Sequence, residues 1–468
     1  MSEQVIIIIL FFICLGQAWA VLKGRKTAVT YYICVAPLSY FSIWQFGTLD
    51  PARLCGVIII AGALLKFQRP KWIPAFRHHS FFYFTLYVIG VTFIGSFFWP
   101  IDAMVGRSIV YEKLRSTVQI LNWLIAVGVA WQIAISLSIP NDFKKIRKIV
   151  IAVGIVHSLY ALYQIFAFYF NLPMTGINRP YSEIGEAYGI SQYGIHTFEN
   201  IGIYRVNSFV GEPKHFGTIS LIWIGLLLSL YLEGAKERGL FLKTLLFFIV
   251  LLLTQSTVAF IGCLIALILA TVGSFYYRKT NLHIFIIALL IIGCGTILLD
   301  KMNIFSIGKG NIIEIISERS TQRLSDIVLN GPNDLPEIEA IEVLKQKPYL
   351  GLLGTGLGGI SFYIAKNLYG SDIILTPNNG FLSFICSIGI IGVFFMIICF
   401  KRGIYLALSS AHHVKKEIKS LAFVGLILIL QSFVFNSNIL TFAFGFLLAA
   451  EFMNRKNESL NEQEDRAQ

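Results

Sequence analysis

Residues 204–232 read YRVNSFVGEPKHFGTISLIWIGLLLSLYL, a polar segment that passes at Pro213 into a long apolar run. Proline suits the first position of a helix, and a run of this length is about what a bilayer-spanning helix needs. The junction carries four ionisable side chains, Arg205, Glu212, Lys214 and His215. A helix N-terminus already carries partial positive charge and attracts acids, so basic side chains there need an explanation.

The composition of the whole chain is that of a membrane protein. Of its 468 residues, 56% are hydrophobic and only 14% are charged, whereas a soluble globular protein carries about 25% charged residues. The net charge of +12 indicates membrane topology, and no basic helix with interleaved aromatic residues points to a nucleic-acid partner. The seven cysteines fall in apolar runs without metal-ligand spacing, so we expect neither a disulfide framework nor a metal site.

The apolar runs predict an all-α polytopic membrane protein with about 12–14 transmembrane helices. The first run precedes a basic cluster and is expected to be a retained helix, not a cleaved signal peptide. The helices form a single transmembrane domain over residues 1–456, and a disordered cytoplasmic tail is expected over 457–468. The expected helices lie near residues 4–22, 28–47, 53–65, 80–99, 118–139, 149–170, 214–232, 241–254, 256–275, 282–299, 380–400, 420–436 and 438–453.

The turns between these helices are of two kinds. One set is short and basic, among them KGRK (23–26) and NDFKKIRK (141–148), and it holds most of the Lys and Arg residues. By the positive-inside rule this side is cytoplasmic. The two long loops, about 171–213 and 300–379, and the short turn LTQST (253–257) then face the opposite side. Any chemistry is expected there, where ATP and nucleotide sugars are absent.

The second long loop is expected to be partly helical. Within it, GNIIEIISERSTQRLSDIVLNG (310–331) and NDLPEIEAIEVLKQKP (333–348) have helical patterns, and the latter begins with Asp334 as a cap and ends before Pro348. The glycines of PYLGLLGTGLGGISF (348–362) are expected to allow a tight re-entry of the chain toward the membrane. No Gly-Lys-Ser/Thr follows them, so this segment is not a nucleotide-binding loop.

A bound anion explains the basic residues at the start of the 214–232 helix. The free N–H groups of the helix start, Lys214 and His215 converge there; Arg205 lies a short loop upstream, and Gly211 allows an unusual backbone turn. Helix N-termini bind phosphate groups, and arginine donates forked hydrogen bonds to phosphate oxygens. A diphosphate is therefore the expected ligand. The alternative interpretation is that these side chains contact lipid headgroups.

The outer loops hold further polar groups, each with a structural alternative. Arg319 and Arg323 share one predicted helical face, where they bind an anion or pair with neighbouring acids. Asn378 and Asn379 precede the helix at 380–400 and either contact an acceptor or cap the helix. His157, in mid-helix, is interpreted as a hydrogen-bonded core residue. The first long loop offers bases or solvated side chains at Glu183, Glu186, His196 and Glu199.

Taken in order, these segments resemble one known family. An arginine precedes SFVGEPKHFG (208–217), LTQSTVAFIG (253–262) opens a helix, an outer loop carries an arginine followed by P-x-x-G-x-x-G-x-G, and NNGFLSFICSIGIIG (378–392) opens another helix. From about Arg205 to Gly392 the chain resembles the O-antigen polymerase and O-antigen ligase superfamily of bacterial inner-membrane glycosyltransferases. The N-terminal helices agree with that superfamily only in hydropathy.

The resemblance implies an all-helical fold of the C-type glycosyltransferase class. It also implies an undecaprenyl-diphosphate-linked oligosaccharide as donor and transfer without metal or other cofactor at the periplasmic face of the inner membrane. Arg205 and Arg323 match the family's motif arginines, which engage the lipid diphosphate, and Arg319 is the alternate match. Membrane lipids and a polysaccharide chain-length regulator are the further partners that the resemblance implies.

Departures from the family pattern favour a polymerase over a ligase. Ligases of this family carry a His-Asn pair where this chain has Asn378 and Asn379, and asparagine cannot act as a base. Many members carry an arginine in the LTQST segment, near the position where this chain has Thr257. The Glu-Pro of GEPKHFG resembles the polymerases.

The expected activity is polymerisation of a surface polysaccharide such as O-antigen, by transfer of a growing glycan from undecaprenyl diphosphate to the non-reducing end of a second lipid-linked repeat unit. Arg205, Lys214 and Arg323 are expected to stabilise the leaving diphosphate, and Glu212, with His215 second, to act as base. The alternatives are a ligase that transfers glycan to lipid A-core, and a transporter that flips lipid-linked sugars. A transporter would favour charges deep inside helices, whereas here they cluster at helix ends.

Overall fold

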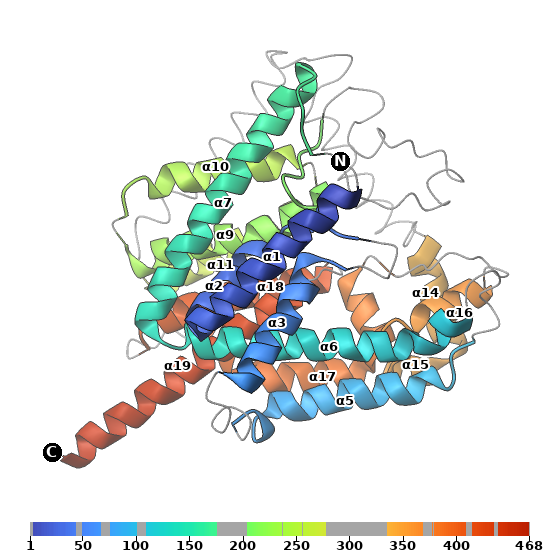
Figure 1. Ribbon diagram of the computed structural model, residues 1–468. Coiled ribbons are helices and arrows are strands. Elements are labelled where there is room, and N and C mark those ends of the chain that lie inside the picture. The colour runs from blue at the N-terminus through green and yellow to red at the C-terminus, as the bar shows by residue number, and fades with distance from the viewer. Residues whose placement is uncertain are drawn as a thin grey trace.

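The computed structural model describes residues 3–43, 49–66, 75–100, 109–175, 204–235, 237–254, 256–277, 335–367, 377, 379–408, 414–434 and 439–467. Within these residues every regular element is a helix, which confirms the expected all-α class (Figure 1). A helix stands at each predicted position except 282–299, which lies outside the described residues. The helices are α1 (Glu3–Lys23), α2 (Arg25–Val35), α3 (Pro51–Leu65), α5 (Ser80–Ser96), α6 (Ile109–Leu137), α7 (Pro140–Tyr169), α9 (Pro213–Glu233), α10 (Leu240–Leu253), α11 (Thr257–Tyr277), α14 (Leu335–Gln346), α15 (Pro348–Leu353), α16 (Ile360–Asn367), α17 (Gly380–Leu408), α18 (Lys416–Val434) and α19 (Leu440–Ala467).

The described helices have the length and apolar surface of a membrane protein. Five of them, α1, α6, α7, α9 and α17, contain apolar stretches long enough to cross a bilayer, and shorter apolar helices accompany them. Large apolar side chains lie exposed on their outer faces, such as Phe11 and Phe12 of α1 and Phe394 of α17, all more than 60% exposed. Lipid is the environment in which apolar faces of this kind are stable. The protein is therefore embedded in a membrane.

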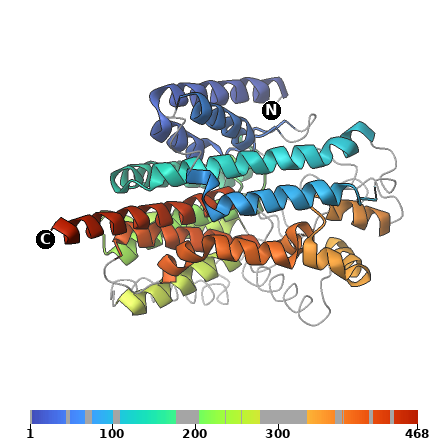
Figure 2. The same ribbon diagram turned by 90° about the horizontal axis from the view of Figure 1, so that it is seen from below.

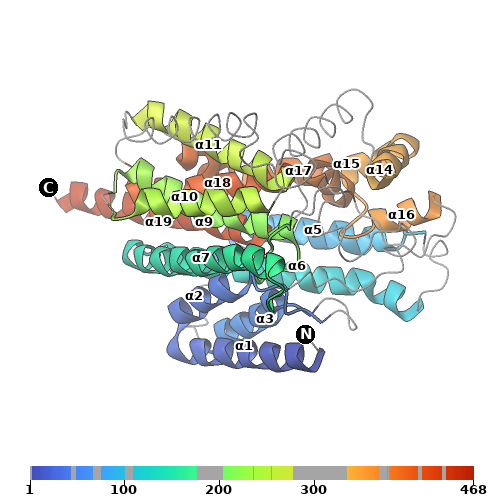
Figure 3. The same ribbon diagram turned by 90° about the horizontal axis from the view of Figure 1, so that it is seen from above.

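Helix α9 lies in the interior of the bundle, between α7, α10, α11 and α18 (Figures 2 and 3). Every residue from 220 to 230 is buried, as expected for a helix that is apolar all round. Two glycines let its neighbours approach closely: a Cβ at Gly225 would lie 3.5 Å from Val424 of α18, and one at Gly217 only 2.5 Å from Ala259 of α11. This packing fixes the position at which α9 begins.

One end of the bundle is crossed by ion pairs. Arg147 of α7 binds both carboxylate oxygens of Glu233 at the end of α9, and Lys144 pairs with Glu417 of α18 at 2.8 Å. Because Arg147 and Glu233 are nearly buried, removing either partner would leave an uncompensated charge and cost about 3–5 kcal/mol. Further pairs are Lys26–Asp142, Lys243–Glu237 and Arg402–Glu458. All of these link segments in or beside the basic turns, so those turns share one end of the bundle, here named the ion-paired end.

The described part of the second long loop is helical, as predicted. Helix α14 ends before Pro348, which opens the short helix α15. The chain then passes through a glycine turn (residues 354–359) in which Gly354, Gly356 and Gly358 have φ values of 90°, 83° and 74°, a conformation that favours glycine. Trp99, just after α5, donates from Nε1 to the Thr355 carbonyl at 2.7 Å. The tight turn expected of these glycines is therefore found, packed between α5 and α17.

The glycine turn replaces hydrogen bonds that α17 loses at a kink. Gly389 of α17 has φ 70° and ψ 171°, which interrupts the helical ladder. The carbonyl of Cys386 instead accepts from Thr355 N at 2.7 Å, and the carbonyl of Ser387 from Gly356 N at 3.0 Å. Irregular backbone is tolerated at membrane depth where protein covers it in this way. The kink sets the direction of the first turns of α17.

Replacing Gly389 by alanine should destabilise the protein by about 2–4 kcal/mol. A Cβ there would lie 2.2 Å from the carbonyl oxygen of Leu352, and alanine would also be strained at a positive φ. Thermal unfolding of the detergent-solubilised protein measures the loss. The matched control is Gly90→Ala on α5, where a Cβ meets no atom within 4 Å and no loss is expected. Equal unfolding temperatures for the two variants would contradict this account of the kink.

Three expectations about the secondary structure are wrong. The basic turn expected at 141–148 is the first part of α7. The helix predicted over 28–47 ends at Val35, because Pro37 lacks an N–H group, and the following segment packs instead on the approach to α9: Tyr40 N donates to the Phe209 carbonyl at 3.1 Å. The predicted disordered tail over 457–468 is helical as far as Ala467, as a continuation of α19. An ion pair between Glu458 and Arg402 of α17 holds the start of that segment.

Candidate functional site

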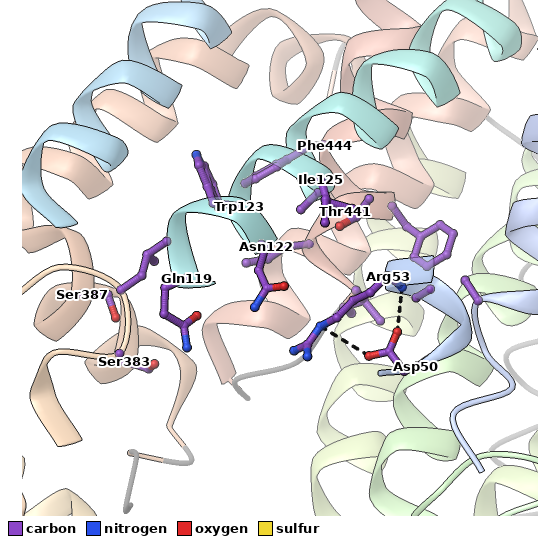
Figure 4. Close-up of a pocket in the computed structure, with 18 of the residues that line it drawn as sticks. Asp50, Arg53, Gln119, Asn122, Trp123, Ile125, Ser383, Ser387, Thr441 and Phe444 are labelled. Carbon is purple, nitrogen blue, oxygen red and sulfur yellow. Dashed lines mark hydrogen bonds and ion pairs between the residues drawn. The ribbon is translucent and has the colours of Figure 1, made fainter. Parts of the chain in front are cut away.

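A cavity of about 440 Å³ lies at the opposite end of the bundle from the ion-paired end. Figure 4 shows part of its wall. The first turns of α3, α9, α17 and α19 line it, together with the first half of α6 and the glycine turn. His215 lines it near the start of α9, whereas Glu233 at the ion-paired end lies about 27 Å away along the same helix, at 1.5 Å per residue. This end is the one that the alternation of basic turns assigns to the outer side. We name it the cavity end.

Arg53 reaches the cavity from the first turn of α3. The sequence Asp50-Pro51 starts this helix: the Asp50 Oδ1 atom accepts from Arg53 N at 2.7 Å, and Pro51 occupies the first helical position. The Asp50 Oδ2 atom lies 3.5 Å from Arg53 Nε, so the cap also fixes the guanidinium at the cavity wall (Figure 4). Burial raises the pKa of the Asp50 carboxyl above its usual value, while Arg53 and backbone N–H groups partly oppose that rise.

Arg115 of α6 is the most buried of the basic side chains in the cavity wall, only 7% exposed. Its Nη2 atom donates to Ser361 Oγ at 3.4 Å, and its guanidinium lies over the Phe362 ring, 5.2 Å from the ring centre. A Cβ at Gly358 would lie 3.3 Å from Arg115 Nε, so glycine at this point of the turn lets the backbone approach the guanidinium. The glycine turn, which the sequence predicts as a tight backbone turn, thus also packs against the Arg115 guanidinium in the cavity wall.

His215 is the predicted site residue that faces the cavity. It lies in the first turn of α9, whose start at Pro213 is within one residue of the predicted position. Glu212 occupies the N-cap position without a side-chain capping bond, and its carbonyl accepts from Phe216 N at 3.0 Å. Gly211 does not supply the unusual backbone conformation expected of it; Ser208, with φ 52°, does.

The other predicted residues near this helix do not line the cavity. Lys214 pairs with Glu212, Nζ to Oε2, at 3.5 Å. Arg205 donates from Nε to the carbonyl of Thr254 at 3.3 Å, at the end of α10, and a Cβ on Gly217 of α9 would lie 3.1 Å from Thr254 Oγ1. The structure therefore brings His215 together with Arg53 and Arg115, and leaves Arg205 and Lys214 outside the cavity wall.

A buried hydrogen-bond network fixes the segment that leads into α9. Gln164 of α7 accepts from Ser208 N at 2.7 Å and donates to Asn207 Oδ1 at 2.9 Å. Ser208 Oγ donates to the His157 carbonyl at 2.9 Å and lies 3.1 Å from His157 Nδ1. Asn207 Nδ2 donates to the Val210 carbonyl at 2.6 Å. His157 is thus a buried, hydrogen-bonded residue, and the network holds the start of α9 against α7.

Asn379 is the N-cap of α17. Its Oδ1 atom accepts from Leu382 N at 2.9 Å, its carbonyl accepts from Ser383 N at 2.9 Å, and its own N–H donates to Glu337 of α14 at 3.0 Å. These contacts give Asn379 a structural role. The other predicted positions lie outside the described residues, or outside the described side chains in the case of Thr257: Glu183, Glu186, His196, Glu199, Arg319, Arg323, Asn378 and Thr257.

Arg53 and Arg115 are the cavity residues that our reading of the sequence missed. For each of these two arginines, the surrounding sequence contains a pattern that indicates its place in the fold. Asp50-Pro51 is a helix start on the predicted outer side, with Arg53 in its first turn. In the stretch RSTVQILN, Arg115, Gln119 and Asn122 recur at helical spacing within an otherwise apolar helix.

Comparison of the chain with known protein families and with curated proteins finds no match. A function must therefore be inferred from the cavity, its charge and the order of the sequence motifs.

Proposed function

We propose that the chain is a polysaccharide polymerase of the O-antigen polymerase type. It would transfer a growing glycan from undecaprenyl diphosphate to a second lipid-linked repeat unit. The observation that carries the proposal is the cavity lined by Arg53, Arg115 and His215 at the end of the bundle opposite the ion pairs. Among the described residues that line it, Asp50 is the one carboxylate, so the wall has a net positive charge.

The positive wall suits a leaving diphosphate. When the glycosidic bond to the lipid breaks, its electron pair stays on the diphosphate, and the anomeric carbon becomes electron-poor. Fixed cations shielded from water stabilise that negative charge, each by roughly 3–4 kcal/mol of barrier in comparable oxyanion sites. In this proposal Arg53 and Arg115 bind the diphosphate. Arginine also matches phosphate oxygens with two parallel donors.

The acceptor hydroxyl attacks the anomeric carbon and loses a proton. Of the two bases expected from the sequence, His215 lines the cavity, whereas Glu212 is paired with Lys214 and does not. We therefore assign the proton transfer to His215: the new bond joins the acceptor oxygen to the anomeric carbon, and the proton passes to a ring nitrogen. This reverses the order of the two residues that the sequence suggested.

The remaining basic residues keep the roles that the family resemblance gives them, as part of the proposal. Lys214, which is in the first turn of α9 and pairs with Glu212, and Arg205, just before that helix, would contribute to the potential near the cavity. Arg323, or Arg319, would reach the diphosphate from the second long loop. The proposal also includes the C-type glycosyltransferase fold, about 12–14 transmembrane helices, residence in a bacterial inner membrane, and a cavity that faces the periplasm.

Two experiments test the activity. The purified protein in lipid nanodiscs, given an undecaprenyl-diphosphate-linked repeat unit, should produce a ladder of longer lipid-linked glycans. A strain that lacks the gene should carry a single repeat unit on lipid A-core. Bare core with polymer stranded on undecaprenyl diphosphate would instead identify a ligase. Movement of the lipid-linked sugar without any new bond would identify a transporter.

A further inference from the structure

We propose that neutral polar side chains of the same cavity form a sugar-binding subsite, separate from the cationic part. This inference rests on the proposed function, because it takes the glycan as the ligand. The subsite consists of two amides of α6, Gln119 and Asn122, and two hydroxyl groups, Ser387 of α17 and Thr441 of α19, all in the cavity wall. Gln119, Asn122 and Thr441 lie outside the motifs that carry the family resemblance, and Ser387, which lies inside the motif at 378–392, has no role assigned by that resemblance.

The two amides lie on the cavity face of α6, next to its arginine. Gln119 and Asn122 follow Arg115 by four and seven residues, which places all three on one side of a helix, about 6 Å and 10 Å apart along its axis. In Figure 4 both amide groups are turned to the open space that the Arg53 guanidinium also faces, and Ser387 lies beside Gln119, on the side away from Arg53. The two amides therefore line the same cavity as the arginines, within reach of a sugar joined to a diphosphate bound there.

The four side chains have unused hydrogen-bonding capacity. Within the part of the chain that the structure describes, none of them makes a side-chain hydrogen bond. The buried amide of Gln164 differs, because both its oxygen and its nitrogen are engaged by the approach to α9. All four are half-buried in the cavity wall, so their donors and acceptors are available to a ligand that enters the cavity.

The chemistry of the four groups fits a neutral sugar. An amide offers two donors and an acceptor, a hydroxyl group offers one donor and two lone pairs, and a sugar hydroxyl can pair with either. None of the four carries a charge, so they would not hold a second phosphate as the arginines do. Beyond Asn122 the wall turns apolar, where Trp123 packs on Phe84 and Phe444 with ring centres 5.8 Å and 6.2 Å apart. A few polar groups in a largely apolar pocket are what fixes ligand orientation.

The test separates sugar binding from lipid-diphosphate binding. The full-length protein in nanodiscs is titrated with two probes: the free oligosaccharide released by mild acid from the lipid-linked repeat unit, and undecaprenyl diphosphate without sugar. The double variant Gln119→Ala, Asn122→Ala should bind the oligosaccharide roughly 10- to 30-fold more weakly, since each neutral hydrogen-bonding group contributes about 1 kcal/mol. Its affinity for undecaprenyl diphosphate should stay within about twofold. The matched control, Gln346→Ala, truncates an exposed amide on α14 and should change neither.

Each outcome decides the proposal. The subsite is overturned if the double variant binds the oligosaccharide with unchanged affinity, or if its affinities for the two probes fall equally. It is also overturned if the wild-type protein binds no oligosaccharide. Should the double variant unfold, Ser387→Ala replaces it, with an expected loss of about threefold to fivefold in oligosaccharide affinity alone.

The subsite and the polymerase proposal fail separately. A wild-type protein that binds the oligosaccharide through these residues but never lengthens lipid-linked glycan keeps the subsite and loses the polymerase. If the wild-type protein lengthens lipid-linked glycan but the double variant binds the oligosaccharide as tightly as wild type, the polymerase proposal stands and the subsite fails.

Discussion

Replacing Arg115 by alanine should abolish glycan polymerisation while the protein stays in the membrane. Arg115 is buried in the cavity wall, and its guanidinium is held by Ser361 and the Phe362 ring, so it acts as a fixed cation. Loss of one such group at a developing oxyanion costs about 10²–10³ in rate. The initial rate of chain lengthening by purified protein in nanodiscs measures the effect, with thermal unfolding recorded for the same samples.

Two further variants make this result specific. Arg115→Lys keeps the charge but loses the forked geometry, so it should retain part of the rate, about 10-fold below wild type. Lys345→Ala removes a cation on α14 whose side chain is 70% exposed and pairs with Glu342 at 3.7 Å; its rate should match wild type. A folded Arg115→Ala protein with near-normal chain lengthening would remove Arg115 from the mechanism.

Replacing His215 by glutamine should slow transfer by about 100-fold or more and leave undecaprenyl diphosphate binding intact. Glutamine keeps a hydrogen-bonding group in the cavity wall but cannot take the acceptor proton. Single-turnover transfer, with binding measured separately, distinguishes the two steps.

Glu212→Gln is the matched variant for His215→Gln, because the sequence alone made Glu212 the first choice of base. Glu212 pairs with Lys214 outside the cavity, so the structure leads us to expect transfer within a few-fold of wild type. An inactive Glu212→Gln protein beside an active His215→Gln protein would return the role of base to Glu212.

The sequence predicts most of the helices, because a long apolar run in a bilayer is stable as a membrane-spanning helix. The helices α9 and α10 were expected near their observed positions for this reason, whereas α7 begins nine residues before its expected start at 149 and α17 ends eight residues after its expected end at 400. The apolar run at 28–47 predicted too long a helix, because hydropathy takes no account of Pro37 or of the hydrogen bond from Tyr40 to the segment before α9. At the other end of the chain, polarity suggested disorder where α19 continues as a helix.

The cavity was only partly predictable, because it is made by segments far apart in the chain. The start of α9 and the presence of His215 there followed from Pro213 and the apolar run. Arg53 and Arg115 meet His215 only through the packing of α3, α6 and α9, which spacing along the chain does not reveal. Spacing also grouped Lys214 and Arg205 with His215, whereas the first turn of α9 directs His215 alone to the cavity.

The binding place of the lipid diphosphate is the central claim, and a structure of the complex tests it most directly. The measurement is an electron cryo-microscopy map of the protein in nanodiscs with an undecaprenyl-diphosphate-linked repeat unit. We expect density for the two phosphates in the cavity, within hydrogen-bonding distance of Arg53 and Arg115 and beside His215. Phosphate density elsewhere on the protein, with the cavity free of ligand, would contradict the account.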